Sequence, residues 1–229
     1  MPSLAWSVAA TRSTEVQTVM NEQPRAAVAG NALLSFFPGV DQVMRERVQM
    51  ALLFAQRATQ GLVDEDLLQD RYDHFRRQLM FLGWDAQAPR ESWDPDPRRR
   101  QTMDQMLRRI SASAGNRNSD VTRWSIDVLR ASDKGLLHFE QRVFAQESFM
   151  LLTCRASLPG CLDLLLYHER LEQEQWLRGF LFRERVMTAA RAELVRFNTS
   201  LFDQQFAERV GASLRLALSY DVYELQDAM

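Results

Sequence analysis

The sequence predicts an α+β fold: N-terminal helices that include an α-hairpin, then a C-terminal antiparallel sheet of about four strands closed by a C-terminal helix. Three observations predict it. Apolar residues recur at helical spacing from residue 41 to 82 and again from 200 to 218. Between these regions, two strand-like segments flank the turn Leu158-Pro159-Gly160. An all-α fold is the alternative, because good helix formers dominate residues 162–197.

The bulk composition is that of a folded protein. The chain has 229 residues, of which 46% are hydrophobic and 25% charged, so it can bury a core. We divide it into an N-terminal arm (1–39), a helical region (40–132), and the sheet with its terminal helix (133–229), packed as one compact unit. The arm is rich in Ala, Ser, Thr and Val without a sustained period, and we expect at most one short element in it.

Two helices are predicted first. Asp41 can cap a helix that runs to about Ala58. A second helix opens with acids at 64–66, where the helix dipole favours negative charge, and Gly83 ends it. Its apolar stripe comprises Leu68, Tyr72, Phe75, Leu79 and Leu82. Because the connection between the two is short, we expect an antiparallel α-hairpin.

The middle of the chain is less regular. Residues 84–97 contain three prolines and no period, which predicts a loop. Helices are expected at 99–113 and at 121–130, separated by a breaker, and residues 133–146 carry no clear pattern.

Four strands are expected next: 147–157 and 161–171 as a hairpin, then 176–186 and 189–198. The first three of these segments would place apolar side chains on both faces, so the sheet needs cover on each side. Either the chain's own helices supply both layers, or one face is an interface or a membrane-directed surface. Ser200 can cap the closing helix.

Motifs for chemistry are missing from the sequence. It has no G-x-G-x-x-G, P-loop, G-x-S-x-G or H-E-x-x-H pattern, three histidines and two cysteines. A Cys154–His168 dyad is disfavoured, because hairpin register separates the two by roughly 16 Å along the strands. We therefore predict no catalytic residue, no cofactor and no metal site; the Asp94-Pro-Asp96 pair is read as turn chemistry.

Nucleic-acid binding is not predicted either. The net charge is −2, whereas phosphate recognition usually needs a basic excess. The run Arg98-Arg99-Arg100, with Arg108, Arg109 and two nearby tryptophans, resembles a basic and aromatic patch. Six arginines in residues 85–109 are offset by five acids, so we interpret it as a solvated, salt-bridged face.

Localisation is predicted to be cytoplasmic. No apolar run approaches the roughly 18–20 residues that span a bilayer. The first residues, MPSLAWSVAATRSTE, place no basic residue ahead of a short, interrupted apolar patch, unlike a secretory signal.

These observations favour a non-enzymatic bacterial structural, accessory or adaptor protein that acts through protein contacts and self-associates. The bacterial assignment reflects arginine dominance over a single lysine, which a GC-rich genome explains. The candidate interface comprises Trp176, Arg178, Phe180 and Phe182, large aromatics interleaved with arginine. The alternatives are a pore-forming toxin that is soluble before it rearranges, and an enzyme with an unfamiliar site at Glu169, Glu172, Glu174 and Arg178.

Overall fold

An eight-stranded mixed sheet runs through the computed structural model, which describes residues 23–60, 68–88, 90–172 and 178–225. The strand order is β10-β1-β2-β6-β7-β9-β3, and β4 also pairs with β9. Of these pairings, only β2 with β6 is parallel. The strands are β1 (Arg25–Ala29), β2 (Ala32–Phe36), β3 (Trp84–Ala86), β4 (Glu91–Trp93), β6 (Ser148–Ala156), β7 (Cys161–Arg170), β9 (Ala190–Asn198) and β10 (Val222–Leu225).

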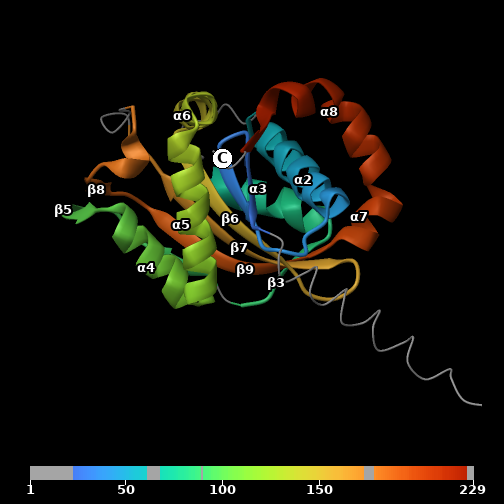
Figure 1. Ribbon diagram of the computed structural model, residues 1–229, viewed down its shortest axis with the longest axis horizontal. Coiled ribbons are helices and arrows are strands. Elements are labelled where there is room, and N and C mark those ends of the chain that lie inside the picture. The colour runs from blue at the N-terminus through green and yellow to red at the C-terminus, as the bar shows by residue number, and fades with distance from the viewer. Residues whose placement is uncertain (1–22, 61–67, 89, 173–177, 226–229) are drawn as a thin grey trace, which may run out of the picture.

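Helices cover both faces of this sheet, and Figure 1 shows the two helical layers on either side of it. One layer contains α2 (Gln42–Gln60), α3 (Leu68–Phe81), α7 (Thr199–Gln205) and α8 (Ala207–Asp221). The other contains α4 (Met103–Ala114), α5 (Asn116–Ala131) and α6 (Asp133–Gln146). Strand residues alternate between the two cores; Leu164 and Leu166 pack on the first, and Leu165 and Tyr167 on the second. The α+β class is confirmed, and the chain's own helices supply both layers.

The predicted helices at 41–58 and 64–82 are present as α2 and α3. The Met44 backbone N–H donates to Asp41 Oδ1 (2.8 Å), as expected of a cap. In α3, Tyr72, Phe75 and Leu79 are buried as the stripe predicts. The expected start at residues 64–66 lies outside the described residues.

The predicted hairpin and the strand at 189–198 are also present, and they exclude the all-α alternative. β6 and β7 pair from Ser148 opposite Arg170 to Ala156 opposite Leu162. The turn brings Gly160, with φ +70°, against Ser200; a Cβ there would lie 2.0 Å from the Ser200 hydroxyl oxygen. The chain therefore needs glycine at this position.

The expectation of at most one short element in residues 1–39 was wrong, because β1 and β2 both fall there. Both strands lie inside the sheet, and four of the five residues of β1 and all five of β2 are buried. A strand covered on both faces shows no alternation, so the period that marks a half-exposed strand is missing. Strands from all three predicted regions thus share one sheet.

Residues 84–97 form more than a loop. They contain β3, β4 and the start of β5 (Asp96–Gln101), which pairs with β8 (Arg185–Met187) in a separate ribbon. The helix expected at 99–113 begins at 103 instead, because Thr102 and Gln105 form a capping box.

The remaining helices differ from expectation mainly in their ends. α5 starts at residue 116 rather than 121, and the unassigned residues 133–146 form α6. The helix expected at 200–218 is two helices that meet at Phe206. Asn198, not Ser200, caps the first of them, since its side chain accepts from the Leu201 N–H (2.9 Å).

Candidate functional site

A pocket of about 380 Å³ opens where β6 begins, β7 ends and β9 begins. Strand register brings these ends together: Ser148 lies opposite Arg170, and Glu169 opposite Ala190. Helix α3 and the segment around β4 complete the wall. The lining residues are Arg71, Tyr72, Arg90, Ser92, Trp93, Asp94, Pro95, Gln146, Glu147, Ser148, His168, Arg170, Ala189, Ala190 and Arg191.

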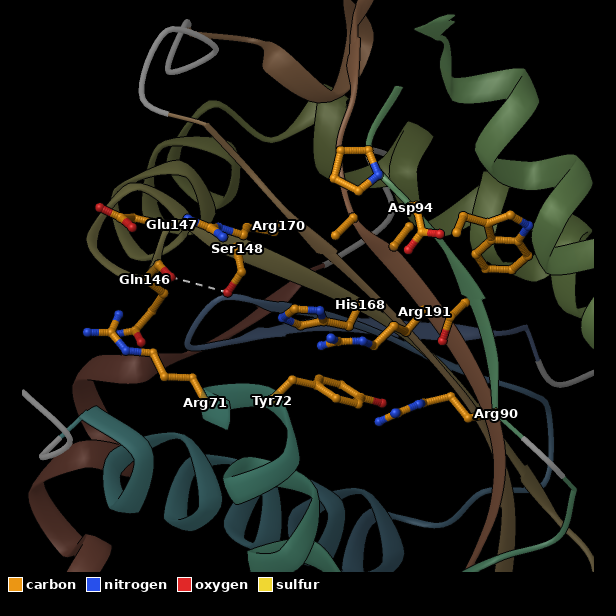
Figure 2. A pocket seen from close by; sticks show the side chains of 15 residues that line it. Arg71, Tyr72, Arg90, Asp94, Gln146, Glu147, Ser148, His168, Arg170 and Arg191 are labelled. Carbon is orange, nitrogen blue, oxygen red and sulfur yellow. Dashed lines mark hydrogen bonds between the residues drawn. The ribbon is translucent and has the colours of Figure 1, made fainter. Parts of the chain in front are cut away.

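Tyr72 and His168 form the centre of the pocket wall (Figure 2). Their ring centroids are 4.7 Å apart at an interplanar angle of 46°. Two guanidinium groups flank the Tyr72 ring, with Arg191 at 4.9 Å and Arg90 at 5.6 Å from its centroid. Guanidinium groups at such distances are attracted to the aromatic ring. Tyr72 therefore helps to keep the Arg90 and Arg191 side chains beside the pocket.

The buried carboxylate of Glu193 accepts a hydrogen bond from the hydroxyl group of Tyr72. The Tyr72 hydroxyl donates to Glu193 Oε2 (3.4 Å), and Arg76 Nη2 lies 2.6 Å from Glu193 Oε1. Burial, and then the charge of Glu193, raises the pKa of Tyr72 well above its ordinary value. Tyr72 therefore stays protonated, and the Glu193 charge is compensated by Arg76 rather than by the pocket arginines.

His168 is neutral in this environment. Burial, reinforced by the charge of Arg191, lowers the pKa of His168 to about 3. The positive charge of the pocket therefore comes from arginine alone at neutral pH.

Arginines outnumber carboxylates in the lining, four to two. Arg71 and Arg90 lie on either side of Tyr72, and Arg191 lies beside His168 (Figure 2). Arg90 is also bonded to Asp73 outside the pocket (2.6 Å). The Glu147 carboxylate points away from His168 (Figure 2), so it does not offset the charge at the centre.

The junction of α6 and β6 forms a well-anchored rim. Glu147 has φ +53°, a conformation that non-glycine residues rarely adopt, and its carbonyl accepts from the Leu171 N–H (2.8 Å). Asn31 Nδ2 donates to the Ser148 carbonyl (2.9 Å) and hydroxyl (3.2 Å), and the Ser148 hydroxyl donates to the Gln146 carbonyl (3.3 Å). The left-handed conformation of Glu147 ends α6, which is a common way for a helix to terminate.

The chemistry that this arrangement supports is binding. A general base works best when its pKa lies near the working pH, and His168 titrates far below it. Among the described residues, no group of three or more His, Cys, Asp or Glu side chains is placed to hold a metal ion.

The candidate interface residues are not brought together as a strand face. Trp176 lies outside the described residues, and Arg178 is exposed. Phe180 begins a 3₁₀ turn, η3 (Phe180–Phe182), and is buried against Phe139 and Phe149. Phe182 is half-buried, with the Arg130 guanidinium 5.0 Å from its ring. The strand expected at 176–186 was wrong over its described part: of residues 178–186, only 185 and 186 lie in a strand, β8, and Gly179, at φ +74°, turns the chain beforehand.

The carboxylates considered for an enzyme site are not gathered either. Glu169 is fully buried and bonded to Arg185 Nε (2.8 Å), Tyr167 and Gln101. Glu172 is exposed, and Glu174 lies outside the described residues.

Cys154 is buried, which raises the pKa of its thiol well above the ordinary value. It pairs with Leu164 of β7. His168 pairs with Met150, four positions from Cys154 along the strand, so the two do not form a dyad.

Sequence reasoning missed the pocket. Tyr72 was assigned to an apolar stripe and His168 to an alternating strand, and both assignments agree with the structure. One sequence signal could have indicated the pocket: Arg170 and Arg191 both lie next to predicted strand ends.

Comparisons with known proteins add little. No family model matches the sequence, and a search of curated proteins finds no match. Among solved structures, the chain is similar to the Evf virulence factor, with a TM-score of 0.33 and 11% identity over 91% of this chain and 90% of that one. A TM-score this low carries no inference. Within the described ranges, no helix has the length and apolar character needed to cross a bilayer.

Proposed function

We propose that the protein is a non-enzymatic binding protein whose pocket holds a small anionic molecule, one that carries a carboxylate or phosphate group. The observation that supports this most is the convergence of arginines from three elements on one recess. Arg71 comes from α3, Arg170 from β7 and Arg191 from β9.

Guanidinium groups suit such a ligand because their planar N–H fork matches the oxygen geometry of carboxylates and phosphates. The recess partly excludes water, which strengthens charge-assisted hydrogen bonds. The Tyr72 ring already orders Arg90 and Arg191, so less conformational entropy is lost when they bind.

The neutral state of His168 supports a binding role over an acid–base role. It can donate or accept one hydrogen bond to a ligand without adding charge. Because arginine stays charged throughout the accessible pH range, any change of anion affinity between pH 6 and 9 should follow the ionisation of the anion itself. A site that relied on protonated histidine would lose affinity over the same range.

The test is isothermal titration calorimetry with citrate and inorganic phosphate as probes. We expect Arg191→Gln to weaken binding by roughly tenfold or more, since hydrogen bonds between charged groups are worth about 1.5–3 kcal/mol. Arg215→Gln is the matched control: it removes the same charge from an exposed position on α8.

Equal weakening by the two variants would contradict the proposal, because it would mean that the anions respond only to net charge. Failure of both probes to bind the wild-type protein at millimolar concentration would contradict it as well.

A further inference from the structure

A second cationic recess lies apart from this pocket, between the β5–β8 ribbon and α4. Its volume is about 360 Å³, and it is lined by Arg99, Arg100, Gln105, Arg108, Arg109 and Met187. No carboxylate lines it. Arg99 and Arg100 come from β5, and Arg108 and Arg109 from α4 one turn beyond Gln105.

Carboxylate partners are scarce at this recess. Ion pairs join arginine to carboxylate at ten places in the described part of the chain. In the recess only Arg99 has such a partner, Asp96 at 3.1 Å. Among the described residues, no carboxylate lies within ion-pair distance of Arg100, Arg108 or Arg109. Four like charges repel one another at close range, so a multivalent anion would relieve the repulsion.

The floor of the recess is ordered. Arg109 Nη2 donates to Met187 Sδ (3.1 Å), and its guanidinium lies 5.0 Å from the centroid of the Trp93 ring. Arg109 is half-buried, whereas Arg100 and Arg108 are exposed at the sides. One positioned guanidinium with exposed ones around it is an arrangement that can contact a compact anion from several sides.

The nearby aromatics are not available for stacking on bases. Trp84 is buried against Phe197, and Trp93 is covered by Arg109. Single-stranded nucleic acid is bound by exposed aromatic platforms along a basic groove, so the recess does not fit that class.

We propose that this recess is a binding site for clustered phosphates: a small polyphosphorylated anion or the polyphosphorylated headgroup of a lipid. Three closely spaced phosphates carry enough negative charge to satisfy the arginines that lack a carboxylate. The site shares no lining residue with the pocket between α3 and β9, although Trp93, which lines that pocket, contacts Arg109 of this recess.

The test uses tripolyphosphate in calorimetry with the full chain. We expect Arg100→Gln/Arg108→Gln to weaken binding by about tenfold for each arginine lost. The matched control, Arg98→Gln/Arg117→Gln, removes two charges from exposed positions outside the recess and should stay within about twofold of wild type. Arg191→Gln should not change the binding of tripolyphosphate to this recess, because Arg191 lines only the first pocket. The failure of one proposal can therefore be told from the failure of the other.

A second experiment distinguishes a lipid headgroup from a soluble anion. Sedimentation with vesicles that contain a phosphatidylinositol bisphosphate, lost in Arg100→Gln/Arg108→Gln, would assign the site to a lipid headgroup; binding of tripolyphosphate alone would assign it to a soluble anion. Equal weakening in both double variants would overturn the proposal. So would single-stranded DNA binding that depends on Arg100 and Arg108 while tripolyphosphate neither binds nor competes.

Discussion

His168 shows how strongly burial decides what a residue can do. Its ring contacts Tyr72 and stands near Arg191, and these surroundings lower its pKa to about 3. An unfolded histidine titrates near 6.5. Between these values the unfolded chain binds a proton that the folded protein does not, so stability contributed by neutral His168 is present above about pH 6.5 and falls as the pH is lowered toward 3.

We therefore predict that His168→Gln flattens the acid side of the stability profile. The wild-type protein should lose up to about 1.4 kcal/mol of unfolding free energy per pH unit below pH 6.5 through this residue alone. Urea unfolding at pH 7, 6 and 5 measures the difference between the two proteins, since other titrating groups are common to both. Parallel profiles would show that His168 is not held neutral.

At the scale of elements, β7 serves both cores at once. His168 faces the pocket on the α3 side, while the next residue, Glu169, faces the opposite core and bonds to Arg185 on β8. The pair is almost inaccessible, at 3% exposure for Arg185 and 0% for Glu169. It ties the β5–β8 ribbon to the sheet, because Gln101 of β5 also donates to Glu169 (2.5 Å).

We predict that Arg185→Met costs about 3–5 kcal/mol, because it leaves a buried carboxylate without its counter-charge. The double variant Glu169→Leu/Arg185→Met should recover much of that loss. Arg196→Met is the control: its pair with Asp163 is partly exposed, so its loss should cost far less than the loss of Arg185. Urea melts of the four proteins measure these costs, and a double variant no more stable than Arg185→Met would contradict a coupled pair.

At the scale of the whole molecule, helices cover both faces of the sheet in the part of the chain that the structure describes. If the protein self-associates through the candidate interface, the contact has to involve those candidate residues that are exposed. Arg178 is exposed and Phe182 is half-exposed, whereas Phe180 belongs to the core.

The self-association prediction is tested by light scattering coupled to size-exclusion chromatography. We expect wild-type protein to elute as an oligomer, and Arg178→Glu and Phe182→Glu to elute as monomers with near-normal melting. Arg178→Glu is the cleaner variant, because an exposed substitution usually changes stability by less than about 0.5 kcal/mol. A wild-type monomer, or assembly that survives both changes, would rule the interface out.

The amino-acid sequence by itself favoured the α+β class over an all-α fold, and it indicated the helices α2 and α3, the β6–β7 hairpin and β9. Each rests on a local signal: helical or alternating periodicity, a capping aspartate, or a turn at Leu158–Gly160. Such signals act within one turn or one strand, so they survive whatever the rest of the chain does.

Only the tertiary structure decided the place of β1 and β2 and which residues meet in the first pocket, whereas the arginines of the second recess already stand together in the sequence. β1 and β2 are buried on both faces, which erases the alternation that would reveal them. Tyr72, His168 and Arg191 come from three different elements. The local sequence patterns predict a helix stripe or a strand for each, but they do not predict that the three side chains lie together. Strand register and helix packing set which side chains meet, and both depend on contacts between residues far apart in the chain.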